Sequence, residues 1–243
     1  MCDSMAPLDP DASFKFGCSP GVACFNECCR DLNQFLTPYD VVRLKNRLGL
    51  PSDVFLARYT RRHTGPGTGL PVVTLAPADP ARLTCPFVAP SGCRIYPDRP
   101  SSCRTYPLVR ILRRPRESEG ILEEYRLLKE SHCRGFDAAR QQTVREWITN
   151  QGLADYHAEN DRLLEVIALK ARLSRKALPP SLEDQVYMAF YDMDRFRGRL
   201  CDGNPELAGL PAELIEPARR DETALLRLGL EWVKQLLKRT LTR

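Results

Sequence analysis

The pattern of hydrophobic and polar positions changes about 140 residues into the chain. Beyond that point apolar side chains recur every three or four positions, which is the spacing of a helix with one buried face. The pattern predicts helices over residues 153–173, 181–200 and 221–239, with a short one following Thr143. Pro179 interrupts the pattern, because proline ends or kinks a helix. The second part of the chain is therefore expected to be helical.

The first 140 residues contain more turn signals and shorter elements. The pair Thr37 and Pro38 predicts the start of a helix that continues to Gly49. Ser52 is expected to cap the next helix. The apolar and alternating patterns predict three strands: one over 70–75, and a β-hairpin of 108–113 and 121–129 around the polar stretch 115–120. These elements predict an α+β fold: a loop-rich region over residues 1–140, then a helical region over 141–243.

Cysteine is the residue type whose number and placement are unusual. The chain has ten cysteines, and eight of them lie between positions 18 and 133. Cys2 lies near the first residue and Cys201 stands alone in the second half. The first residues have no basic flank with an apolar core, and no stretch is apolar enough to cross a membrane, so a cytoplasmic protein is expected. In a reducing compartment, clustered cysteines favour metal or redox chemistry over disulfides.

The eight clustered cysteines are the candidate metal ligands: Cys18, Cys24, Cys28, Cys29, Cys85, Cys93, Cys103 and Cys133. A spacing of four residues would place Cys24 and Cys28 on one face of a helical turn, close enough to share an ion. Adjacent cysteines usually point apart, so Cys28 and Cys29 suggest two centres, or one ligand with a structural or redox thiol. Eight thiolates suffice for two four-cysteine sites, of zinc or iron–sulfur type. Packing as small buried hydrophobes explains the isolated Cys201 better than the cluster.

Four arginines directly follow cysteines: Arg30, Arg94, Arg104 and Arg134. Thiolates around a divalent ion carry net negative charge, which guanidinium groups can offset while donating hydrogen bonds. The alternative is that these arginines form a solvated surface. The net charge of +5 is too small to indicate nucleic acid as a partner.

Three stretches together resemble a known family. The first runs from Phe16 to Arg30, followed by Leu36 to Asp40 and Arg43 with Leu44. The second comprises Cys85 to Phe87, Cys93 to Pro100 and Cys103 to Leu108. The third runs from Glu124 to Phe136, with Thr143 to Trp147 and Gln151 to Leu153 beyond it. Over residues 14–157 the chain resembles the YkgJ-type cysteine-cluster proteins, although five residues separate Cys18 from Cys24 where many members have fewer. The resemblance implies chelation of zinc or an iron–sulfur cluster by the cysteines in a bacterial cytoplasmic protein.

Three functions fit this pattern. The first is chelation of metal ions, with an iron–sulfur cluster such as 4Fe–4S favoured over Zn²⁺ because the adjacent pair and the surplus thiols suit a cluster. The second is an iron–sulfur oxidoreductase or a protein-modifying enzyme similar to the flagellin lysine methylases, with Cys29 or Cys133 as a free thiol; no glycine-rich loop for a nucleotide-like methyl donor follows a strand. The third is a zinc-organised module that binds a protein partner or nucleic acid, which lacks a recognised finger spacing here.

Overall fold

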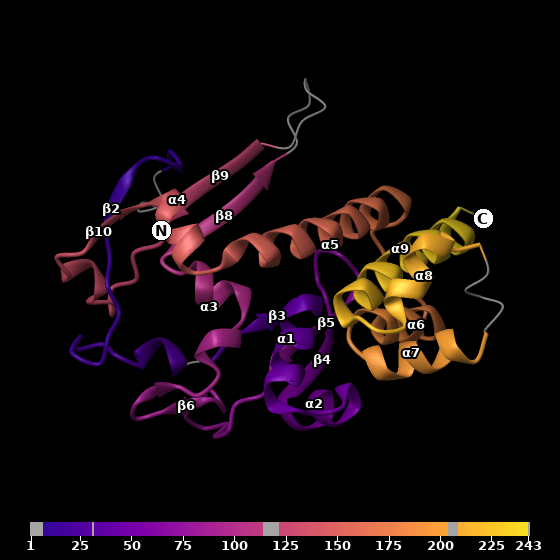
Figure 1. The fold of residues 1–243 in the computed structure, drawn as a ribbon, viewed down its shortest axis with the longest axis horizontal. Coiled ribbons are helices and arrows are strands. Elements are labelled where there is room, and N and C mark those ends of the chain that lie inside the picture. Colours follow the sequence, from indigo (N-terminus) through magenta and orange to yellow (C-terminus); the bar gives the residue numbers. More distant parts are fainter. Residues whose placement is uncertain (1–6, 31, 114–121, 204–208, 243) are drawn as a thin grey trace.

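The computed structural model describes residues 7–30, 32–113, 122–203 and 209–242. Small antiparallel sheets and short helices precede a helical region, so the predicted α+β fold class is confirmed (Figure 1). Helix α5, Leu153–Leu173, extends from the sheets to the C-terminal helices. Among the described helices, none has the length and apolar character needed to cross a membrane. The division into regions 1–140 and 141–243 stays a prediction.

The predicted hairpin forms the largest pairing in the N-terminal region. Strand β8, Leu108–Arg113, pairs antiparallel with β9, Leu122–Leu127, with Leu108 opposite Leu127. The short strand β1, Pro7–Leu8, adds to the free edge of β9. The predicted turn at 115–120 lies outside the described residues.

A second three-stranded sheet has the order β3-β5-β4. Its strands are β3, Phe35–Leu36; β4, Thr60–Thr64; and β5, Pro71–Leu75. The central strand buries Pro71, Val73 and Leu75 on one face, which confirms the predicted strand. Strand β4 was not predicted, because four of its five residues are exposed and polar and show no alternation.

Two further pairs of strands follow, of which the first connects distant segments and the second is a local ribbon. Strand β2, Ser13–Lys15, pairs with β10, Gln141–Thr143, and β6, Val88–Ala89, pairs with β7, Gly92–Cys93. Short helical turns occur between them: the 3₁₀ turns η1, Glu27–Cys29, η2, Tyr96–Asp98, and η3, Gly135–Asp137, and the helix α3, Ser101–Thr105. All of the predicted metal ligands lie in this loop-rich part of the chain.

Helix α1, Pro38–Leu48, begins and ends as predicted. The Thr37 hydroxyl accepts a hydrogen bond from the Asp40 amide, the Asp40 carboxylate accepts one from the Thr37 amide, and Gly49 ends the helix at φ 63°. Helix α2 spans Ser52–Tyr59, and the prediction that Ser52 caps it is wrong. Ser52 is the first helical residue, and its hydroxyl donates to the Asp192 carboxylate at 2.6 Å, which ties α2 to a distant helix instead.

The C-terminal region contains α4, Val144–Asn150; α5; α6, Pro180–Phe190; α7, Met193–Cys201; α8, Ala212–Ala218; and α9, Glu222–Leu241. Thr143 caps α4 with Glu146 as the reciprocal partner, as predicted. The single helix predicted over 181–200 is wrong, because the chain breaks at Tyr191 and Asp192 caps α7. Helix α8 was not predicted.

Close packing and buried polar groups hold the helices together. A Cβ atom on Gly229 of α9 would lie 2.6 Å from the Ala189 carbonyl oxygen of α6, so these helices need a glycine at their contact. The buried Lys170 ammonium donates to the carbonyl oxygens of Thr68, Ser174 and Lys176, at 3.4, 2.8 and 2.7 Å. These bonds fix the segment after α5 against the loop that precedes β5.

Candidate metal centre

The first cysteine segment folds as a series of tight turns. The amides of Phe25, Glu27 and Cys29 each bond to the carbonyl three residues earlier, and Asn26 adopts a left-handed φ of 69°. The helical turn expected to align Cys24 with Cys28 is therefore interrupted at Asn26, and η1 begins only at Glu27. The Asn26 side-chain amide donates to the Ala89 carbonyl at 2.9 Å and so holds this segment against β6.

The second segment approaches the first through its backbone. The Cys85 amide donates to the Cys29 carbonyl at 2.8 Å. Cys93 lies opposite Val88 in the β6–β7 ribbon. Cys29 and Cys85 are thus placed by a hydrogen bond between segments more than fifty residues apart in the sequence, and Cys93 is placed by the local ribbon that follows Cys85.

Helix α3 carries Cys103 and is anchored by a buried carboxylate. The Asp40 oxygens accept hydrogen bonds from the Ser101 amide at 2.7 Å and the Ser101 hydroxyl at 3.1 Å. The Cys103 thiol donates to the side-chain oxygen of Gln34 at 3.5 Å. Cys103 is an exposed residue, yet protein atoms crowd its sulfur, and this desolvation together with the charges of Cys85 and Cys28 raises the pKa of the thiol to about 12.

The last segment brings Cys133 beside the start of the cluster. The Arg134 amide donates to the Cys24 sulfur at 3.0 Å, and the Gly17 amide donates to the Gly135 carbonyl at 2.9 Å. The buried Tyr106 hydroxyl faces the Cys133 thiol without a well-aligned hydrogen bond. Residues 17–24 and 133–135 therefore lie together.

The four segments converge on Cys28. Cys29 lies within hydrogen-bonding reach of both Cys28 and Cys85, and these bonds are the largest cause that lowers the pKa of Cys28 and of Cys85 to about 7. The same two bonds are the largest causes that raise the pKa of Cys29, which keeps the shared proton. The adjacent thiols of Cys28 and Cys29 therefore point to one region, contrary to the expectation that they point apart.

The remaining clustered cysteines lie near the trio of Cys28, Cys29 and Cys85. Desolvation raises the pKa of Cys18 and of Cys93, and the negative charge of Cys28 adds to the shift in both. Charges on Cys24 and Cys133 also act on Cys18. All eight cysteines predicted as ligands are thus linked by thiol contacts or by mutual charge effects, whereas no such link involves Cys201 on α7.

The cysteine thiols are donors that suit a thiophilic metal, although their side chains do not surround a common centre. The nine described cysteines are free thiols, and Cys2 lies outside the described residues. Within the described ranges, no three Cys, His, Asp or Glu side chains form a group that could hold a metal ion. Thiolates are the ligands that zinc and iron–sulfur clusters prefer. Ligation by this cluster would require the thiols to turn toward a common centre.

A family model described as "Putative zinc- or iron-chelating domain", named for its CxxCxxCC pattern, matches residues 17–134. Residues 17–134 belong to this CxxCxxCC family. The matched range contains all eight clustered cysteines, from Cys18 to Cys133. No curated protein and no solved structure matches the chain significantly.

The arginines of the CxxCxxCC domain differ sharply in burial. Arg30, Arg94 and Arg134, which follow cysteines, are exposed, as the surface alternative predicts. Arg104 is only 7% exposed. Arg99, which the cysteine spacing did not single out, is also buried, at 8%. Only its place four residues before Cys103, inside the stretch that resembles the family, could have drawn attention to it.

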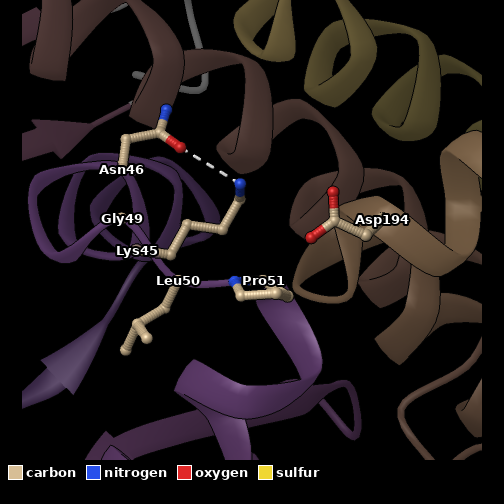
Figure 2. A pocket seen from close by; sticks show the side chains of 6 residues that line it. All are labelled: Lys45, Asn46, Gly49, Leu50, Pro51 and Asp194. Carbon is tan, nitrogen blue, oxygen red and sulfur yellow. Dashed lines mark hydrogen bonds between the residues drawn. The ribbon is translucent and has the colours of Figure 1, made fainter.

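One open depression lies outside the cysteine cluster of the CxxCxxCC domain. It has a volume of about 550 Å³ and is lined by Lys45, Asn46, Gly49, Leu50, Pro51 and Asp194 (Figure 2). The Lys45 ammonium already binds Glu222 at 2.6 Å and Asn46 at 3.1 Å, and the Asp194 carboxylate accepts from the Ser52 amide at 2.7 Å. The polar groups of this depression join helices to one another.

Proposed function

We propose that the CxxCxxCC domain binds iron as an iron–sulfur cluster, held by ligands drawn from Cys18, Cys24, Cys28, Cys29, Cys85, Cys93, Cys103 and Cys133. The observation that carries the proposal is that distant segments meet at residues 24–29. The Cys85 amide bonds to the Cys29 carbonyl, the Arg134 amide bonds to the Cys24 sulfur, and the charge of Cys28 acts on Cys103, with the thiols free of disulfides in the described chain. Thiols separated by more than a hundred residues have no packing reason to gather at a partly exposed surface.

The number and contacts of the thiols favour a cluster over a single zinc ion. A structural zinc site needs four ligands, and eight thiols are grouped here. Cys28 and Cys29 share one region with Cys85, so an adjacent pair faces the same centre. An iron–sulfur cluster supplies electron-transfer chemistry when it is bound. The chain's own contribution is to collect the thiols and to hold the segments in place through Asn26, Asp40 and the Arg134 amide.

Anaerobic purification of the full chain tests the proposal. We expect a brown protein that absorbs near ~400 nm and contains iron and acid-labile sulfide. The variant Cys28→Ser should lose most of the iron, while Cys201→Ser, the matched control on α7, should keep it. A colourless protein with stoichiometric zinc would refute the iron–sulfur cluster and show that the domain holds a zinc site. Absence of both metals, also after reconstitution with ferrous iron and sulfide, would refute chelation by this domain.

A further inference from the structure

Arg99 and Arg104 are buried charges beside the cysteine cluster. Burying an ionised side chain is costly unless an opposite charge or a full set of hydrogen bonds compensates it. Neither guanidinium forms an ion pair with a carboxylate among the residues that the structure describes. Asp98, the carboxylate next to Arg99 in sequence, binds Arg43 instead and lies 3.9 Å from Arg47.

Neutral groups hold both guanidiniums in place. Arg104 donates to the Gln151 carbonyl at 2.6 Å, to the Arg99 carbonyl at 3.1 Å and to the Pro97 carbonyl, and it lies 4.7 Å from the centre of the Tyr156 ring. These partners fix the orientation of the side chain and leave its charge uncompensated. A buried guanidinium that is held in one orientation without an anionic partner indicates that an anion binds close to it.

Neutral groups also hold the Arg99 guanidinium. It donates to the Tyr96 carbonyl at 2.6 Å and to the side-chain oxygen of Gln151, and its guanidinium stacks 3.8 Å from the centre of the Tyr96 ring. The anions within electrostatic reach are thiolates. Burial raises the pKa of Cys18 and lowers the pKa of Arg99. The attraction between Arg99 and the thiolates offsets part of both shifts, since Arg99 acts on Cys18 while Cys103 and Cys93 act on Arg99.

We infer that Arg99 and Arg104 form the counter-charge of an anionic metal–thiolate centre and act as positioning residues for it. The inference rests on the proposed chelating function. Four thiolates around a divalent zinc ion leave two negative charges, and a 4Fe–4S core of charge two plus leaves the same. Two guanidiniums balance that charge, so the loaded centre and its arginines together are neutral. Charge compensation by the protein is one of the means by which surroundings tune a metal site.

The test compares Arg99→Met, which removes the charge, with Arg99→Lys, which keeps it. Arg82→Met is the matched control, since the Arg82 side chain is 84% exposed in the same domain. Zn²⁺ affinity of the reduced full chain is measured by competition with a chromophoric chelator, and thermal unfolding is followed with and without Zn²⁺. We expect Arg99→Met to weaken Zn²⁺ binding about tenfold or more. Arg99→Lys and Arg82→Met should stay within about threefold of the parent chain.

A purely structural role gives a different pattern. Gln151→Leu removes a neutral hydrogen-bond partner and leaves the charge, so it should change Zn²⁺ affinity far less than Arg99→Met does. Equal losses in Arg99→Met, Arg99→Lys and Gln151→Leu would overturn the inference, and so would an Arg99→Met protein that fails to fold without metal. If the parent chain binds neither Zn²⁺ nor reconstituted iron, the proposed function fails instead.

Discussion

The buried carboxylate of Asp40 connects helix α1 to the helix that carries Cys103. Its oxygens accept hydrogen bonds from the Thr37 amide at 2.9 Å, the Ser101 amide at 2.7 Å and the Ser101 hydroxyl at 3.1 Å. The variant Asp40→Asn keeps the shape of the side chain and replaces one acceptor oxygen with an NH₂ group. An NH₂ group cannot accept a hydrogen bond, so at least one buried donor loses its partner.

The expected cost follows from these bonds. A hydrogen bond to a charged group contributes roughly 1.5–3 kcal/mol, and an unpaired buried donor costs about 1–3 kcal/mol. Relief from burying a carboxylate offsets part of this, because desolvation raises the pKa of Asp40 and so disfavours its charged form. We expect a net loss of about 2 kcal/mol in the free energy of unfolding. For a chain of this length, that corresponds to a Tm lower by about 4 °C.

Thermal unfolding followed by circular dichroism measures the change. The matched control is Asp53→Asn in the first turn of α2, because Asp53 is exposed and helix α2 has no side-chain cap. The control should lose only about 0.5 kcal/mol from its interaction with the helix dipole. Equal effects of the two variants, or a higher Tm for Asp40→Asn, would refute the role given to the Asp40 hydrogen bonds.

Three further substitutions test other parts of the fold. Gly229→Ala should lower the free energy of unfolding by about 1–3 kcal/mol because its Cβ meets α6. The control Gly198→Ala, whose Cβ meets open space on α7, should raise the free energy of unfolding by about 0.5–1 kcal/mol. Equal effects of the two variants in urea unfolding would contradict this packing. Burial lowers the pKa of His157 to about 4, so the fold favours the neutral ring and loses stability as pH falls from about 6.5 toward 4. His157→Gln should flatten that decline in Tm, and exposed His63→Gln should not. Lys170→Met should lower Tm through a loss of about 2 kcal/mol, because three carbonyls lose their donor; an unchanged Tm would exclude this role.

Helix ends could be predicted where the capping chemistry is local. Thr37 and Thr143 each find their partner three residues ahead, so both starts were predicted from the sequence. Ser52 has the same capping chemistry, but its hydroxyl bonds to Asp192, 140 residues away. Asp192 in turn caps α7 and so ends the single helix that the apolar periodicity predicted over 181–200. At Ser52 the long-range bond takes the place of a local cap, whereas Asp192 makes that bond and its local cap together. Spacing along the chain contains no information about such a partner.

The candidate site shows a similar limit. Cysteine clustering was sufficient to choose eight residues inside the range that the family model matches, and their role as ligands stays a prediction. It could not predict that Cys28 and Cys29 face one region, because this depends on the left-handed turn at Asn26 and on the approach of Cys85. Arg99 could not be separated from the exposed arginines either. Its burial depends on contacts that only the folded chain provides.

The segment that completes the metal-binding domain lies beyond the residues matched by its family. Strand β10 pairs with β2, and the Trp147 indole donates to the Thr105 carbonyl at 3.0 Å, next to helix α3. Gln151 supplies an oxygen to each buried guanidinium, Arg99 through its side chain and Arg104 through its backbone. These contacts all come from residues after 134, and they reach the strand that precedes Cys18, the helix that carries Cys103, and the two buried arginines. The cysteines supply the candidate ligands, while the start of the helical region holds the charges that an anionic centre would require.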